Sequence, residues 1–170
     1  VTVTSDNGGP GLPSTDTLFV NQIVVPPMIQ KSFSPTVIPL NGTTTSTMTF
    51  IITNPSVNTV ALTGVSFTDL LVPVVLVIAP SPSLTNTCGG TITPSPLAGA
   101  TSISLSGGAI AVNKSCTITV QVIAAPGATA GVKTNITGQV TSTNGGPGNT
   151  GTAQIALLGP PAIVKSFVPG

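Results

Sequence analysis

Apolar and polar residues alternate with a period of two along much of this chain. The alternation is complete or partial in six segments: 47–53, 65–71, 102–106, 116–123, 133–141 and 152–157. β-Branched residues are frequent in these segments, and Gly, Pro or Asn interrupts the chain between them. Such a pattern is typical of β-strands that bury one face. No segment shows helical periodicity with caps, so the pattern predicts an all-β chain.

Seven to nine short strands in a unit of about 135 residues fit an immunoglobulin-like β-sandwich. The Gly pairs at 89–90, 107–108 and 145–146 are expected in turns, because they lack the pattern and the Lys of a phosphate-binding loop. The apolar run 72–79 contains Pro73 and is much shorter than a membrane span. We expect it to be a core strand. If it were exposed, it would be an interface between subunits.

The two ends of the chain repeat each other. Residues 3–11 recur as 140–148 at an offset of 137, and residues 26–35 recur as 160–169 at an offset of 134. A repeat of this length is a whole domain, longer than the 20–50 residues of a solenoid unit. The repeated ends therefore predict a tandem array of folded modules.

The offsets also predict where the modules begin and end. Residues 1–23 would be the closing strands of a preceding repeat, 24–158 one complete β-sandwich, and 159–170 the opening strand of the next repeat. Pro pairs at the two boundaries would stiffen the junctions. In a second hypothesis the chain is a complete subunit, and residues 1–23 add to the sheet of a neighbouring copy as a donor strand.

Charge is nearly absent from the chain, which has four Lys, three Asp and no His. Charged residues make up 4% of it, against about a quarter in ordinary soluble domains. Without a basic patch, nucleic-acid binding is not expected. Low charge also removes repulsion between copies and permits self-association. Asp69 is the only acid within 24–158, so we predict no catalytic site, no metal site and no cofactor.

Cys88 and Cys116 lie within the same unit. An even number of cysteines in a chain rich in Thr, Asn and Gly favours a disulfide bond and an oxidising compartment. The alternative is a pair of free buried thiols in a cytosolic protein. A zinc site is not expected, because two thiolates without His do not complete a tetrahedral site.

Asp69 and Lys31 each allow two interpretations. The simpler one makes Asp69 a turn or cap carboxylate after its strand, and Lys31 a solvated or snorkelling side chain at a module junction. In the second, Lys31 and either Asn135 or Asn149 form an intramolecular isopeptide bond, with Asp69 as the buried acid. Calcium binding by Asp69 is disfavoured, because calcium sites usually need several carboxylates.

Three Asn-x-Ser/Thr triplets begin at Asn41, Asn113 and Asn135. They are possible glycosylation sites in a secreted protein. Such triplets also arise by chance in a chain this rich in Thr and Asn.

Five motifs occur in order along the chain. They are Lys-Ser-Phe-Ser-Pro at 31–35, Asn-Pro at 54–55, Leu-Thr-Gly-Val-Ser-Phe-Thr-Asp at 62–69, Cys-Gly-Gly at 88–90 and Ser-Cys-Thr-Ile-Thr-Val at 115–120. Together they resemble the conserved repeat domain of unknown function found in large bacterial cell-surface and secreted proteins. The resemblance covers nearly the whole unit and includes both cysteines. It implies an immunoglobulin-like β-sandwich, a tandem arrangement and an extracellular location. It implies no catalytic residues.

These observations predict a non-catalytic structural repeat or subunit of an extracellular bacterial filament, sheath or surface stalk. Its partner would be itself, through the module junctions, without membrane insertion. The alternative is an adhesin module that binds a surface glycan or a protein through its loops. Against the alternative, the loops lack the aromatic side chains that usually anchor such ligands.

Overall fold

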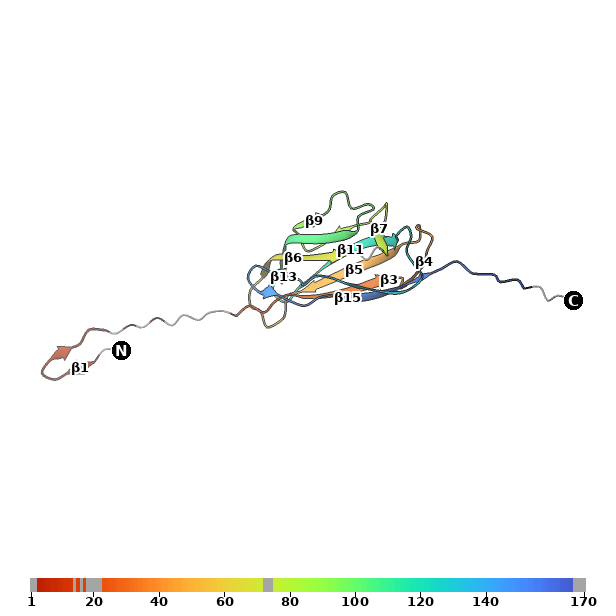
Figure 1. Ribbon diagram of the computed structural model, residues 1–170. Helices are drawn as coiled ribbons and strands as arrows, with labels where there is room; N and C mark the ends of the chain where they lie inside the picture. The colour runs from red at the N-terminus through yellow and green to blue at the C-terminus, as the bar shows by residue number, and fades with distance from the viewer. Residues whose placement is uncertain (1–2, 14, 16, 18–22, 72–74, 167–170) are drawn as a thin grey trace.

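The computed structural model describes residues 3–13, 15, 17, 23–71 and 75–166. This part of the chain contains β-strands and no helix, and most of it forms a β-sandwich (Figure 1). No helix long and apolar enough to cross a membrane occurs among these residues.

The first layer of the sandwich is an antiparallel sheet in the order β3-β5-β11-β7, with β8 also paired to β11. Its strands are β3 (Met28–Ser34), β5 (Ser46–Thr53), β7 (Leu76–Ile78), β8 (Thr85–Asn86) and β11 (Ser115–Ala124). β11 pairs with three of the other strands and therefore lies at the centre of this layer.

The second layer consists of a five-stranded sheet in the order β14-β13-β6-β10-β9 and a three-stranded sheet in the order β12-β15-β4. Its strands are β4 (Val37–Pro39), β6 (Leu62–Leu70), β9 (Thr91–Thr93), β10 (Ser102–Ile110), β12 (Gly131–Ile136), β13 (Thr141–Ser142), β14 (Gly146–Pro147) and β15 (Thr152–Leu158). A single antiparallel bridge between Asp69 and Thr137 joins the two sheets. β4 runs parallel to β15, and the other pairings are antiparallel.

The core lies between the layers and follows from the alternation in the sequence. In β3, Ile29, Lys31 and Phe33 point inward while the residues between them are exposed. The centre is aromatic, since the ring centroids of Phe50 and Phe67 lie 4.9 Å apart across the two layers. The prediction of an all-β sandwich is confirmed.

The segment 133–141, predicted as one strand, is divided in the structure. β12 ends at Ile136 and β13 begins at Thr141. Between them the chain leaves β15 and crosses to β6, where Gly138 N donates a hydrogen bond to Thr68 O at 2.8 Å. The change of partner interrupts the strand, although the alternation of residues continues.

The Gly pair at 107–108 is in a strand and not in a turn, so the strand predicted to end at 106 is longer. β10 runs through both glycines to Ile110, and its register against β6 shifts at Gly108. Gly107 has φ +75°. The pair therefore forms a β-bulge, which needs such a conformation and a close approach of the backbone.

The apolar run 72–79 belongs to the core as far as the structure describes it. Leu76, Ile78 and Ala79 are buried, and Val75 packs against the core. Residues 72–74 lie outside the described residues. The prediction of a core strand is confirmed for β7.

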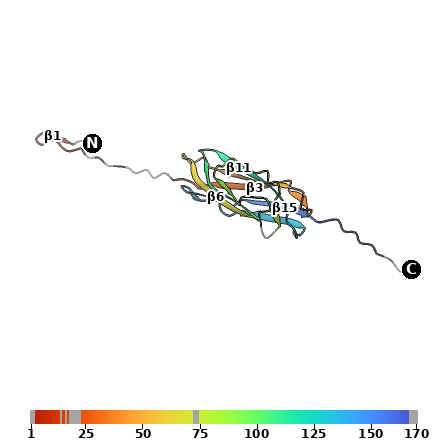
Figure 2. The ribbon, with the colours of Figure 1, turned by 90° about the horizontal axis from the view of Figure 1, so that it is seen from above.

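The sandwich is elongated, and the chain enters and leaves it at opposite ends (Figures 1 and 2). It enters at residues 24–28 and leaves after β15. Before the sandwich, β1 (Thr4–Ser5) and β2 (Gly9–Pro10) form a short hairpin whose residues are all exposed. An arrangement with entry and exit at opposite ends suits a module that is joined to others in a row.

Candidate functional site

A buried cluster of three polar side chains lies between the layers. Lys31 from β3 places its Nζ 2.5 Å from Oδ2 of Asp69, which lies on β6. The same Nζ donates to Oδ1 of Asn135 on β12. The Asn135 Nδ2 donates to the backbone oxygen of Leu70 at 2.7 Å. Three strands from both layers therefore direct one amine, one carboxyl and one carboxamide to a single point.

The period of two explains why these polar groups are inside. Lys31 precedes Phe33 by two residues on β3, and Asp69 follows Phe67 by two on β6, so each lies in the buried phase of its strand. Asn135 is the buried residue of β12, whose other residues are exposed or half-buried. The side chains of Lys31 and Asp69 have no solvent-exposed area.

The surroundings of the lysine are apolar. Its Nζ lies 5.5 Å from the ring centroid of Phe33 and 5.3 Å from that of Phe50. Burial lowers the pKa of Lys31 and raises the pKa of Asp69, while the attraction between the two groups opposes both shifts. Burial therefore favours the amine and the carboxylic acid over the ion pair. The Oδ1 atom of Asp69 is buried without a hydrogen-bond partner among the described residues.

The simpler interpretations of Asp69 and Lys31 are wrong. Asp69 lies within a strand and is not a turn or cap carboxylate, and Lys31 is neither solvated nor snorkelling. Of the residues considered for an isopeptide bond, the structure brings together Lys31, Asp69 and Asn135. Asn149 instead pairs with the backbone of Ile29, accepting from its N at 2.8 Å and donating to its O at 2.9 Å.

The asparagines of the three Asn-x-Ser/Thr triplets differ in solvent exposure. Asn41 and Asn113 are exposed, and Asn41 Oδ1 accepts from the backbone N of Thr43 at 3.0 Å. Asn135 is 7% exposed, and its amide is engaged in the buried cluster. The folded module therefore leaves Asn41 and Asn113, but not Asn135, available to a glycosylating enzyme.

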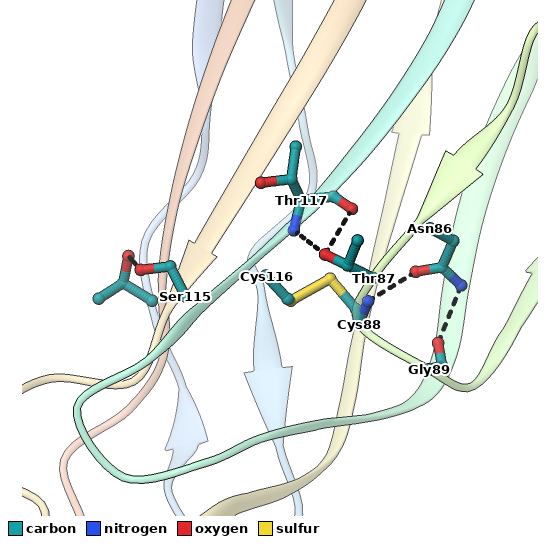
Figure 3. The surroundings of a disulfide bond; sticks show 8 residues. Asn86, Thr87, Cys88, Gly89, Ser115, Cys116 and Thr117 are labelled. Carbon is teal, nitrogen blue, oxygen red and sulfur yellow. Dashed lines mark hydrogen bonds between the residues drawn. A yellow bond between two sulfur atoms is a disulfide. The ribbon is translucent and has the colours of Figure 1, made fainter.

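Cys88 and Cys116 are joined by a disulfide with an S–S distance of 2.07 Å (Figure 3). The bond ties the segment after β8 to the start of β11. Asn86 Oδ1 accepts from Cys88 N at 2.9 Å, and Thr87 Oγ1 accepts from Thr117 N at 2.8 Å. These hydrogen bonds position the first cysteine beside the second, as Figure 3 shows.

Two asparagine side chains attach the entering chain to the module, which the sequence analysis did not anticipate. Asn58 accepts from Val25 N at 2.7 Å and donates to Val25 O at 2.8 Å. Asn149 binds Ile29 in the same two-point manner. Asn58 is buried and also donates to Asn54 at 2.8 Å. The only sequence feature near this attachment that the motifs had singled out was Asn-Pro at 54–55.

The β13–β14 hairpin closes the module by packing over β6 and the entering chain. Asn144 Nδ2 donates to Ala61 O at 2.8 Å, and Thr63 N donates to Asn144 Oδ1 at 3.1 Å. Val140 at the base of the hairpin is fully buried. The hairpin thus docks on a specific surface of the sandwich.

The β1–β2 hairpin repeats the β13–β14 hairpin in structure as well as in sequence. The two pairs of strands have equivalent registers. Ser5 Oγ accepts from Gly8 N at 2.9 Å, as Ser142 Oγ accepts from Gly145 N at 3.0 Å. The turn therefore forms in the same way with or without the docking surface.

This pair of hairpins provides a matched test of docking. A Cβ added at Gly148 would overlap the carbonyl oxygen of Pro27, whereas one at the equivalent Gly11 would meet only Val3 O at 3.1 Å. We expect Gly148→Ala to lower the free energy of unfolding by about 1–3 kcal/mol, the usual range for overpacking. Gly11→Ala should change it by under about 0.5 kcal/mol. Urea unfolding of both variants checks this, and equal losses would contradict the docking difference.

The described residues contain no group of three or more His, Cys, Asp or Glu side chains that could hold a metal ion. The fold defines an all-β sandwich domain. Residues 27–158 match the family described as Domain of unknown function (DUF7933). The chain belongs to this family.

Three solved structures are similar to this chain at low sequence identity. The major pilin subunit BcpA of Bacillus cereus is 15% identical with a TM-score of 0.52, over 77% of this chain and 39% of the pilin. BslA, a bacterial hydrophobin, is 13% identical with a TM-score of 0.48, over 79% of this chain and 96% of BslA. AvmM, which catalyses macrocyclization in alchivemycin A biosynthesis, is 12% identical with a TM-score of 0.46, over 82% of this chain and 92% of AvmM. No curated protein matches the chain.

Proposed function

We propose that this chain is a non-catalytic structural unit of an extracellular bacterial filament, sheath or surface stalk. Its copies join at the module junctions. In this proposal residues 24–158 are the module, residues 1–23 provide the closing hairpin of a preceding unit, and residues 159–170 begin the next one. The observation that supports it best is the duplicated hairpin, which forms the same turn as β13–β14, the hairpin that docks on this module.

The β13–β14 hairpin is docked on the sandwich and the β1–β2 hairpin is not, as the solvent exposure of their equivalent valines shows. Val140 is fully buried in the docked hairpin, whereas Val3 in the duplicate is 73% exposed. Docking of the duplicate on another copy would bury this side chain and supply the hydrogen bonds that Asn144 makes to Ala61 and Thr63. Apolar burial and these bonds favour association between equivalent units.

Two further features fit this role. The near absence of charge lets copies approach without repulsion, and the disulfide suits an oxidising extracellular location. The fold is shared with a pilin subunit, a protein of the same structural class. An adhesin remains the alternative function, with the loops at the ends of the sandwich as its binding surface.

Self-association of the full chain tests the proposal. We expect analytical ultracentrifugation to show oligomers that increase with protein concentration, because the duplicate hairpin can replace its equivalent on another copy. Val3→Asp should abolish them by placing a charge where Val140 is buried. Gly148→Ala should increase them, since it weakens docking of the chain's own hairpin.

Val132→Asp is the matched control, because Val132 is 65% exposed on β12, outside the hairpins. It adds the same charge and should leave association unchanged. A chain that stays monomeric at every concentration, or equal effects of Val3→Asp and Val132→Asp, would overturn the junction proposal. Specific binding of the monomeric chain on a glycan array would support the adhesin instead.

A further inference from the structure

We propose that Lys31 and Asn135 become joined by an intramolecular isopeptide bond, and that Asp69 is the acid–base group that promotes its formation. The bond would link the Nζ of Lys31 to the Cγ of Asn135. This modification does not depend on how modules associate, and it goes beyond the structural role proposed above.

The first argument is the position of the reacting groups. Lys31 Nζ already contacts the carboxamide oxygen of Asn135, so the amine lies beside the carbon that it would attack. The Asn135 amide is held by its hydrogen bond to Leu70 O, which fixes its orientation. Holding two groups in contact removes much of the entropic cost of a reaction between them.

The second argument is the unpartnered oxygen of Asp69. One carboxyl oxygen contacts the lysine, while the buried Oδ1 has no hydrogen-bond partner among the described residues. A buried carboxyl with a purely structural role is expected to be fully hydrogen-bonded. A group that must accept and return a proton during a reaction instead needs a free lone pair.

The third argument is the protonation state that burial favours. The apolar walls of Phe33 and Phe50 lower the pKa of Lys31, and burial raises that of Asp69. Transfer of one proton from Nζ to Oδ2 gives a neutral amine and a carboxylic acid. The neutral amine is the nucleophilic form, and the acid can donate a hydrogen bond to the carboxamide.

The reaction balances without any added reagent. The lone pair of the neutral Nζ forms a bond to Asn135 Cγ, while Asp69 donates its proton to the carboxamide. That proton goes to Nδ2, so the Cγ–Nδ2 bond breaks and Nδ2 leaves as ammonia. Nζ then gives one of its two protons to Asp69, which restores the carboxylic acid. The products are a secondary amide, one molecule of ammonia and Asp69 in its starting form. Surface hollows lined in part by Asn135 provide a route for the ammonia to leave.

The bond would change how the module responds to tension. Force applied at the two ends of the module would pass from Lys31 directly to Asn135, so residues 32–134 would lie inside a covalent loop. The disulfide between Cys88 and Cys116 lies within that loop and would not carry the load. This suits a structural unit whose chain enters and leaves at opposite ends (Figure 1).

Mass spectrometry of the purified, folded full chain tests the proposal. After reduction of the disulfide, we expect an intact mass about 17 Da below the sequence mass, since ammonia is lost when the covalent bond forms. Proteolysis should yield a branched peptide that contains both Lys31 and Asn135. A folded wild-type chain with the full sequence mass would overturn the proposal, and so would a branched peptide that contains Asn149 in place of Asn135.

Variants separate this bond from other losses of ammonia. Asn7-Gly8, Asn41-Gly42 and Asn144-Gly145 can form succinimides with the same loss of mass. Lys31→Arg, Asp69→Ala and Asn135→Ala should each restore the full mass. Lys133→Arg should retain the loss, because Lys133 is a half-buried lysine of β12 whose Nζ donates to Thr129 Oγ1 at 2.9 Å and not to the cluster. Retention of the loss in Lys31→Arg would overturn the proposal. Asn135→Asp should lose water in place of ammonia, which keeps the test informative if another variant fails to fold.

Discussion

Asp69→Ala is expected to lower the free energy of unfolding by about 1–3 kcal/mol, the usual cost of leaving a buried polar group without its hydrogen-bond partner. The change leaves Lys31, whose side chain has no solvent-exposed area, without its acidic partner. It should be measured by urea unfolding in an Asn135→Ala background, where no isopeptide bond can form. The loss then reports on the Lys31–Asp69 pair alone.

Asp6→Ala is the control, because Asp6 lies in the exposed β1–β2 hairpin. We expect it to change stability by under about 0.5 kcal/mol. In the same background, the double change Lys31→Met with Asp69→Leu should recover most of the loss, since an apolar pair of similar volume suits this site. If Asp69→Ala were no more harmful than Asp6→Ala, the pair would contribute little to stability.

The strands could be predicted from the sequence because alternation and burial have the same origin. β5, β11 and β15 closely match the predicted segments, since each keeps one face against the core along its whole length. The errors occurred where a strand changes its partner or its register. β12 ends at Ile136 because the chain crosses to β6. β10 continues past Gly107 because the two glycines form a β-bulge within the strand. Neither event depends on the local pattern of residues.

The polar cluster shows a different limit of sequence analysis. Lys31 lies in the buried phase of β3, but a lysine in that phase has the same sequence signature whether it is buried or snorkels to the surface. Only the folded structure shows that β6 and β12 place a carboxyl group and a carboxamide next to the Lys31 amine. The choice between Asn135 and Asn149 likewise depends on the pairing of β12 with β15, which places one side chain inward and the other against the entering chain.

Removal of the disulfide by Cys88→Ala with Cys116→Ala is expected to lower the free energy of unfolding by about 3–4 kcal/mol. The two cysteines are 28 residues apart, and the estimate follows from the entropy that a loop of this length loses when it is closed. Urea unfolding of the double variant against the oxidised wild type measures the loss. The paired substitution avoids leaving one unpaired thiol.

The stability lost with the disulfide should depend on whether Lys31 and Asn135 are covalently joined. The size of this loss therefore tests for the isopeptide bond. An isopeptide bond would already confine residues 32–134 in the unfolded chain, so the disulfide would close a smaller loop within a larger one. Its entropic contribution should then be smaller in the cross-linked wild type than in the Asn135→Ala background. Ser115→Ala, next to the disulfide, serves as a control with an expected effect of under about 1 kcal/mol, since it removes one exposed hydrogen bond. An equal loss in the two backgrounds would show that the two bonds do not constrain the same part of the unfolded chain.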